Sequence, residues 1–398
     1  MEPQSTGLFI LLMGVFCALL AWLALTKQPV FRILAASLAF IPAMLFGMAA
    51  VNKYYDYYQS WGAVAADFGG QGLSAVPAVP SNITSQRLTA ILDRVTSTRI
   101  AANSGETVRL TVTGARTHIS RAVYVFLPPQ YFQSAYRRHR FPAVELISGY
   151  PGGPLDWINV MGIIQAYQTL LRDQAVQPVA LVMPDPNGAP QTSLQCLNVA
   201  HGPQDATYLA QDLPVYLSRA LRLVPSGPAW AIAGYSEGGY CAANLALLYP
   251  GRYGFAGVLS GYFEPLNTRM GNPSRLIDPF AKSLRLRRLN TPIRRVAALS
   301  FSVVVPQFWL GAGNSDRQDV TAARNFQRLL LPRQPNVTLD LVRGGAHTMA
   351  TWRALVPPLL IWLTSHLAYA AEHPVPPHVV KTARPTSRHR PRPAPSGR

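Results

Sequence analysis

The chain begins with two long apolar runs that carry no charge. Residues 7–26 contain no charged side chain, and after a short connection a second uncharged run covers residues 33–51, broken only by Pro42. About 20 apolar residues is the length that a helix needs to cross a bilayer. The pattern therefore predicts a membrane anchor of two transmembrane helices within residues 1–52. The alternative is one span followed by a buried or interfacial helix.

From about residue 105 the pattern changes to short apolar runs that alternate with helical ones. Such alternation is typical of a mainly parallel sheet covered by helices on both faces, so residues 105–370 are expected to form one α/β domain. The expected strands are 107–114, 121–129, 142–148, 178–184, 229–234, 255–261, 303–311 and 337–344. The expected helices are 159–174, 206–223, 237–249, 320–331 and 351–369.

Three segments fall outside this alternation. Residues 53–104 begin with Tyr and Trp, which favour the head-group region of a membrane, and continue as a Gly- and Pro-rich linker. Residues 264–298 are polar and basic, which suits an insertion or a lid above the sheet. Residues 371–398 are basic and Pro-rich, with too few apolar side chains for a core, and are expected to be disordered.

The formal net charge of +18 suggests an anionic partner. The last eighteen residues supply six positive charges and no negative one, which favours contact with anionic lipid head groups or an anionic envelope polymer. A solvated extension without a partner is the alternative. Nucleic acid is disfavoured, because the sequence shows no nucleic-acid-binding motif.

Charges and cysteines together predict where the α/β domain lies. Lys27 and Arg32 flank the connection between the apolar runs, which favours a cytoplasmic connection and an extracytoplasmic domain. A cleavable signal peptide is not expected, because no Lys or Arg precedes the first run. Cys196 and Cys241 fit a disulfide formed in an oxidising compartment, or else two unrelated buried thiols. Cys17, within the first run, is expected to be a small apolar residue there.

A glycine-flanked serine is the candidate nucleophile. Residues 234–238 (GYSEG) match G-x-S-x-G and lie between an apolar strand and a helix that begins near Glu237. A strand-to-helix turn of this kind leaves room only for small residues and lifts the serine hydroxyl above the edge of the sheet. The pattern predicts that Ser236 is a nucleophile. The alternative is an incidental serine in a glycine-rich turn.

A serine hydroxyl needs a base to take its proton, and behind such a turn the chain order is Ser, acid, His. His347 follows the last expected strand in a glycine-rich loop, and no other histidine has this position. Asp316 and Asp319 both follow the preceding strand. We expect Asp316 to be the acid that orients the imidazole, because it lies in the loop, whereas Asp319 resembles a helix N-cap. Asp319 is the alternative acid.

An oxyanion hole for the tetrahedral intermediate requires two backbone donors. The first expected donor is the N–H of Glu237, directly after the nucleophile. The second should come from the glycine-rich loop at 148–157. Pro151 and Pro154 cannot donate, so the N–H of Tyr150 is the candidate.

From about 105 to 370 the chain resembles the esterase D / antigen 85 group of α/β-hydrolases, the "putative esterase" family, and is most similar to membrane-anchored, actinobacterial-type members. The resemblance is carried by YVFLPPQY at 124–131, VELISGYPGG at 144–153, the GYSEGG turn with the following strand, and GGAHTMATW at 344–352. It implies an α/β-hydrolase fold. By position it implies the nucleophile Ser236, the base His347, the acid Asp316, and the oxyanion donors Glu237 and Tyr150.

Two departures from the group bear on the substrate. Its mycolyltransferases follow the oxyanion residue with an Arg and acidic residues that hold trehalose, whereas here Asp156 is the only charge in the loop. Its general esterases show His-Gly where this chain has Ser148-Gly149. The expected function is a serine esterase that acts through an acyl-enzyme on cell-envelope or lipid-linked esters, without metal or organic cofactor. An acyltransferase with the same triad and a non-catalytic binding protein of the same fold are the alternatives.

Overall fold

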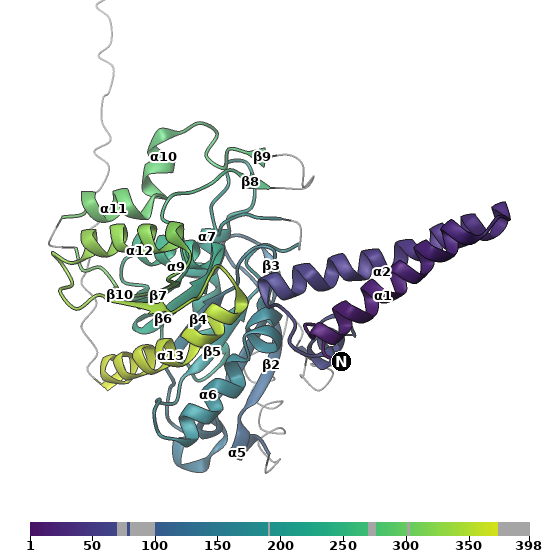
Figure 1. Ribbon diagram of the computed structural model, residues 1–398. Helices are drawn as coiled ribbons and strands as arrows, with labels where there is room; N and C mark the ends of the chain where they lie inside the picture. Colours follow the sequence, from purple (N-terminus) through teal and green to yellow (C-terminus); the bar gives the residue numbers. More distant parts are fainter. Residues whose placement is uncertain (70–77, 80–99, 190–191, 270–275, 301–302, 373–398) are drawn as a thin grey trace, which may run out of the picture.

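The computed structural model describes residues 1–69, 78–79, 100–189, 192–269, 276–300 and 303–372. It shows a layered α/β body from which two long N-terminal helices extend to one side (Figure 1). The tail expected to be disordered lies outside the described residues from 373 on. Most of the expected linker, at 70–77 and 80–99, also lies outside them.

In the described part of the chain, one nine-stranded sheet of order β1-β2-β3-β5-β4-β6-β7-β10-β11 forms the centre of the body. Strand β3 pairs antiparallel with β2 and β5, and the other neighbours in the sheet are parallel. The strands are β1 Ala78–Val79, β2 Glu106–Thr113, β3 Ser120–Leu127, β4 Ala143–Ile147, β5 Ala180–Pro184, β6 Gly227–Tyr235, β7 Tyr253–Leu259, β10 Gln307–Gly313 and β11 Thr338–Val342.

Helices cover both faces of this sheet. Helices α8, α9 and α12 share a core with one face, while α6 and α13 share a core with the other. The helices and helical turns of the body are α5 Ala101–Ser104, η2 Pro129–Phe132, η3 Ser134–Tyr136, η4 Asp156–Val160, α6 Ile163–Arg172, α7 Asp205–Thr207, η5 Tyr208–Asp212, α8 Leu213–Ala220, α9 Glu237–Leu248, α12 Arg317–Leu330 and α13 Met349–Glu372. The mainly parallel α/β fold expected from the sequence is confirmed.

The alternation of side chains along β6 shows how the two cores are separated. Trp230 and Ile232 pack into the core beneath α9, and Ala231 and Ala233 pack into the core beneath α13. All four side chains are fully buried. A central parallel strand buried on both faces reads as one apolar run, which is why 229–234 was recognisable as a strand.

The basic segment 264–298 lies between β7 and β10, and its described part packs on α9. It contains β8 Thr268–Arg269, β9 Leu276–Ile277, α10 Leu284–Leu289 and α11 Pro292–Ala298. Asn290 accepts a hydrogen bond from the Tyr240 hydroxyl through its carbonyl, at 2.7 Å, and one from the Asn244 amide through its side chain, at 3.0 Å. Arg295 Nε donates to the Leu247 carbonyl at 2.8 Å. This segment therefore supports the helix that follows Ser236.

The two N-terminal helices form an antiparallel pair. Helix α1 Thr6–Leu25 begins after Ser5, whose hydroxyl accepts from the Leu8 N–H, and α2 Pro29–Tyr55 ends at Asp56 in the left-handed conformation. Both are long and apolar enough to cross a membrane by length and composition. The start of α1 and the end of α2 lie beside the body, and the turn between the helices points away from it (Figure 1). A third helix, α3 Trp61–Gly69, follows.

A disulfide joins Cys196 to Cys241, with Cα atoms 5.6 Å apart. It links the loop after β5 to the first turns of α9, and both cysteines are buried. This is the pair expected from the sequence. Cys17 is free and exposed in α1.

Removing this disulfide, by reductant or in the Cys196→Ala/Cys241→Ala variant, is expected to destabilise the body by about 4 kcal/mol. The reason is that a cross-link between residues 45 positions apart restricts the unfolded chain. The measurement is thermal unfolding of the full-length protein in detergent, with and without reductant. Cys17→Ala is the control and should respond to reductant as the wild type does. Identical wild-type midpoints in both conditions would contradict the prediction.

Candidate active site

Ser236 occupies the turn between β6 and α9 with φ 54° and ψ −120°. The turn depends on the glycines on either side. A Cβ atom on Gly234 would lie 2.1 Å from the carbonyl oxygen of Gly238, and a Cβ on Gly238 would lie 2.1 Å from that of Ile147. Residues larger than glycine therefore do not fit at positions 234 and 238 when α9 begins immediately after the strand and Ser236. The turn presents Ser236 at the carboxyl ends of β4 and β6.

A hydrogen-bond relay leads away from this serine. The Ser236 hydroxyl lies 2.9 Å from Nε2 of His347, and Nδ1 of the same ring lies 2.7 Å from an Asp319 carboxylate oxygen. With the ring proton on Nδ1, His347 donates to Asp319 and its Nε2 can accept the serine proton. The ring of Trp352 meets the imidazole edge-on, with ring centroids 4.9 Å apart, and limits how far it can tilt.

The positions of the two carboxylates are the reverse of those expected from the sequence: Asp319, the alternative acid, contacts the imidazole, and Asp316 caps a helix. Asp316, the preferred acid, is the N-cap of α12, where its Oδ1 accepts from the backbone N–H groups of Gln318 and Asp319 at 3.0 and 3.1 Å. Its nearer oxygen is 3.8 Å from Nδ1 of His347. Helix α12 begins at Arg317, three residues earlier than the apolar pattern indicated. Asp319 therefore lies in the first turn, close to the imidazole.

Nearby charges and burial have opposite effects on the pKa of His347. Burial of the ring opposes protonation, but the hydrogen bond and the charge of Asp319, with the charge of Asp316, outweigh it and raise the pKa of His347 above 6.5. These three residues also bring possible metal-ligand atoms within 4.8 Å of one another. The hydrogen bond between Nδ1 and Asp319 accounts for this cluster without an ion.

Two backbone segments adjoin the nucleophile, the loop at 148–150 and the start of α9. A Cβ atom on Gly149 would lie 3.1 Å from Cβ of Ser236, so the segment 148–150 passes directly beside the serine. Tyr150 lines the same cavity as Ser236. Glu237 is the first residue of α9, where N–H groups lack partners within the helix and the helix dipole favours negative charge. The two expected oxyanion donors therefore lie on segments adjoining the serine.

The side chain of Glu237 has a structural role that sequence reasoning missed. It is buried and accepts hydrogen bonds from the Ser193 hydroxyl and, at 3.5 Å, from the Asn187 amide. Burial raises the pKa of Glu237 to about 7, although these hydrogen bonds oppose the shift. The contacts tie the start of α9 to the loop after β5. No local pattern reveals them, because the partners lie 44 and 50 positions away.

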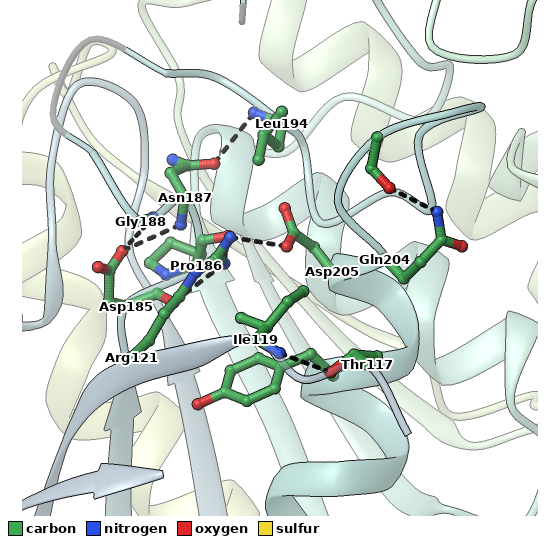
Figure 2. A network of polar contacts seen from close by, with 12 residues as sticks. Thr117, Ile119, Arg121, Asp185, Pro186, Asn187, Gly188, Leu194, Gln204 and Asp205 are labelled. Carbon is green, nitrogen blue, oxygen red and sulfur yellow. Dashed lines mark hydrogen bonds and ion pairs between the residues drawn. The ribbon is translucent and has the colours of Figure 1, made fainter. Parts of the chain in front are cut away.

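That loop is itself fixed by the polar network in Figure 2. Arg121 on β3 donates to the Pro186 carbonyl at 2.7 Å and pairs with the buried Asp205 at 2.8 Å. Asn187 accepts from the Leu194 N–H at 3.0 Å, which closes the loop on itself. The loop that supports Glu237 is thus held at both ends by buried hydrogen bonds.

Ser236 and His347 open into a cavity of about 960 Å³. One wall belongs to the body and includes Tyr150, Tyr235 and Trp352. The other wall belongs to the N-terminal helices, which contribute among others Leu8, Leu12, Met44, Leu45, Met48 and Val64. No pattern in the sequence indicates this second wall. Within the described part of 264–298, no residue lines the cavity, so a role for that insertion as a lid gains no support.

Two solved structures that resemble this chain are an esterase and a serine hydrolase. The chain resembles a ferulic acid esterase over 66% of its own length and 99% of that chain, with 17% identity and a TM-score of 0.55. It resembles a fluorophosphonate-binding serine hydrolase of Staphylococcus aureus over 65% and 98% of the two chains, with 19% identity and a TM-score of 0.52. At these identities the comparison establishes the α/β-hydrolase fold.

Curated relatives match in sequence over part of their length. An uncharacterized protein of Corynebacterium glutamicum is 26% identical over 250 residues, which cover 61% of this chain and 57% of that protein. The MPT51 antigen of Mycobacterium leprae is 45% identical over 62 residues, covering 16% of this chain and 20% of the antigen. The matched part of the chain thus spans little more than half of the first relative and a fifth of the second.

The family comparison covers most of the body. The model of the family described as "Putative esterase" matches residues 114–363, which is more than half of the chain. The match includes the turn at Ser236, both carboxylates and His347. The chain therefore belongs to the Putative esterase family and has the α/β-hydrolase fold.

Proposed function

We propose that this protein is a serine esterase that cleaves carboxylic esters through a covalent acyl-enzyme. The observation that carries the proposal is the continuous relay from Ser236 through His347 to Asp319. A nucleophile, a base and an orienting acid in hydrogen-bond contact are the groups that this chemistry needs. Membership of the esterase family supports the same reaction class.

In the first half-reaction, Ser236 Oγ attacks the ester carbonyl carbon while its proton passes to Nε2 of His347. Asp319 stabilises the resulting imidazolium and keeps the ring in the tautomer that can accept the proton. The N–H groups of Glu237 and Tyr150 hold the negative charge that develops on the carbonyl oxygen. His347 then gives the proton to the leaving alcohol, and the acyl group stays on Ser236.

In the second half-reaction, His347 takes a proton from water while the water oxygen attacks the acyl carbon. The bond from this carbon to Ser236 Oγ then breaks, His347 returns the proton to Oγ, and the carboxylic acid leaves. An alcohol entering in place of water would make the protein an acyltransferase with the same residues. Products formed with and without added sugar or lipid alcohols distinguish the two reactions. Free acid as the main product under both conditions is expected of the esterase.

The proposed location is a membrane, with the catalytic body on the extracytoplasmic side. The apolar pair α1–α2 supports membrane attachment, and the disulfide between Cys196 and Cys241 supports an oxidising compartment. Lys27 and Arg32 at the turn of the helical pair favour a cytoplasmic turn. In this setting we propose cell-envelope or lipid-linked esters as substrates.

Ser236→Ala is expected to abolish both fluorophosphonate labelling and ester turnover, with kcat lower by about 10⁴-fold or more, because no nucleophile remains. The assay is labelling of the detergent-solubilised full-length chain together with hydrolysis of p-nitrophenyl esters. Ser218→Ala on α8, which does not line the cavity, serves as the control. Equal labelling of wild type and Ser236→Ala would overturn the proposed function.

Asp319→Asn and Asp316→Asn form a matched pair that tests which carboxylate acts. Asp319→Asn should lower kcat by about 10³- to 10⁴-fold, because an amide favours the wrong imidazole tautomer. Asp316→Asn should stay close to wild type, because Asn caps a helix as well as Asp does. Steady-state kinetics of both variants on one ester provide the measurement. A reversed order of the two effects would make Asp316 the acid.

The pH dependence of kcat/KM should report the ionisation of His347. The imidazole must be neutral to accept the serine proton, so activity should rise with pH through a midpoint above 6.5. Asp316→Asn removes a negative charge 3.8 Å from Nδ1 and should move this midpoint to lower pH. The measurement is the pH profile of both proteins. A midpoint that stays in place or rises in the variant would contradict the assignment.

A further inference from the structure

The cavity at Ser236 has a wall made of the two helices that could cross a membrane. Residues of α1 and α2 line it together with the nucleophile and the base, within one continuous space of about 960 Å³. This volume lies at the upper end of the range found for ligand sites. A ligand that fills the cavity therefore contacts both the catalytic residues and the N-terminal helices.

The cavity is suited to hydrocarbon. Among the lining residues in the described part of the chain, none is Asp, Glu, Lys or Arg. The polar groups near the junction are engaged by neighbours. Asn52 exchanges hydrogen bonds with the backbone of Tyr58, and the hydroxyls of Tyr57 and Tyr235 both donate to Asp156, at 2.6 and 2.9 Å. Several polar groups of the lining are thus already hydrogen-bonded within the protein.

The helical wall is fixed to the body. Asp156, buried beside the nucleophile turn, joins Tyr57, just after α2, to Tyr235, directly before Ser236. Arg353 at the start of α13 pairs with Asp56 and donates to the Val160 carbonyl at 3.0 Å. These contacts hold the end of α2 in one position relative to Ser236. The cavity is therefore a formed part of the active site.

The cavity also extends along the membrane-facing helices. Its lining on α2 covers residues 44–55, about 16 Å of helix at 1.5 Å per residue. Half of a bilayer's hydrocarbon core is about 15 Å thick. The helical pair leads away from the body (Figure 1), so in a membrane this lining reaches the depth of the acyl tails in the adjacent leaflet.

We infer that α1 and α2 form the acyl site of this enzyme, and that the substrate is a membrane-resident ester whose long acyl chain enters along these helices from the adjacent leaflet. The inference rests on the proposed esterase function. The carbonyl carbon lies at Ser236 and the hydrocarbon tail lies against Leu12 and Met48. The two helices thus set the preference for acyl length in addition to attaching the protein.

Gly47→Trp tests this acyl site, with Gly14→Trp as the matched control. Gly47 lines the cavity, Gly14 does not, and a Cβ atom on either glycine meets no heavy atom within 4 Å. The ratio of kcat/KM for p-nitrophenyl palmitate to that for p-nitrophenyl butyrate should fall roughly tenfold or more in Gly47→Trp, because the indole occupies space needed by the long chain. Gly14→Trp should keep the wild-type ratio.

The outcomes separate this inference from the proposed function. Ser236-dependent turnover with an unchanged ratio in Gly47→Trp would overturn the acyl site and leave the esterase intact. Absence of Ser236-dependent turnover in the wild type would overturn the esterase itself. Thermal unfolding checks that each variant is folded. If Gly47→Trp does not fold, Leu12→Trp fills the same cavity from α1. The ratio of kcat/KM for the palmitate ester to that for the butyrate ester in this variant then tests the acyl site.

Entry from the leaflet is tested separately with full-length protein in phosphatidylcholine vesicles. The p-nitrophenyl palmitate is placed either in the same vesicles as the protein or in separate vesicles mixed with them. Turnover several-fold faster in the shared vesicles is expected, because the chain reaches the cavity without leaving the membrane. Equal rates would show that the ester arrives through water and would overturn the membrane route.

Discussion

The close approach of α9 to strands β4 and β6 is the constraint on which the active site depends. Gly234 and Gly238 lie so near Ile147 and each other that no side chain fits between them. This contact allows the chain to reverse from strand to helix within one residue, which holds Ser236 at positive φ. A larger residue at either glycine would push α9 away from the sheet and take the serine with it.

The rest of the body keeps α9 in this position. The disulfide at Cys241 and the buried Glu237 carboxylate both bind the helix to the loop after β5, and the segment 264–298 holds its other side through Asn290. The loop is fixed in turn by the Arg121 network (Figure 2). Elements distant in the chain thus support one short turn, which suits a site that must hold its geometry during reaction.

Asp156 connects the N-terminal helices to the nucleophile turn. It is the only charged residue of the glycine-rich loop, and it accepts hydrogen bonds from Tyr57 and Tyr235 together. The apolar helical pair and the active-site cavity therefore share one buried junction. In the proposed enzyme, the helices that hold the protein at the membrane also face the substrate.

The sequence by itself determined the features that depend on local spacing. Apolar periodicity revealed the strands and helices, because each pattern reflects which faces of an element are buried. The G-x-S-x-G turn and the position of His347 after the last strand could also be predicted, because both depend on the order of residues along the chain. Only the tertiary structure shows that Asp319, and not Asp316, is hydrogen-bonded to the imidazole, because α12 starts three residues earlier than the apolar pattern indicated. The partners of Glu237 and the helical wall of the cavity also needed the folded chain, because they join residues dozens to hundreds of positions apart, and such contacts leave no periodic trace in the sequence.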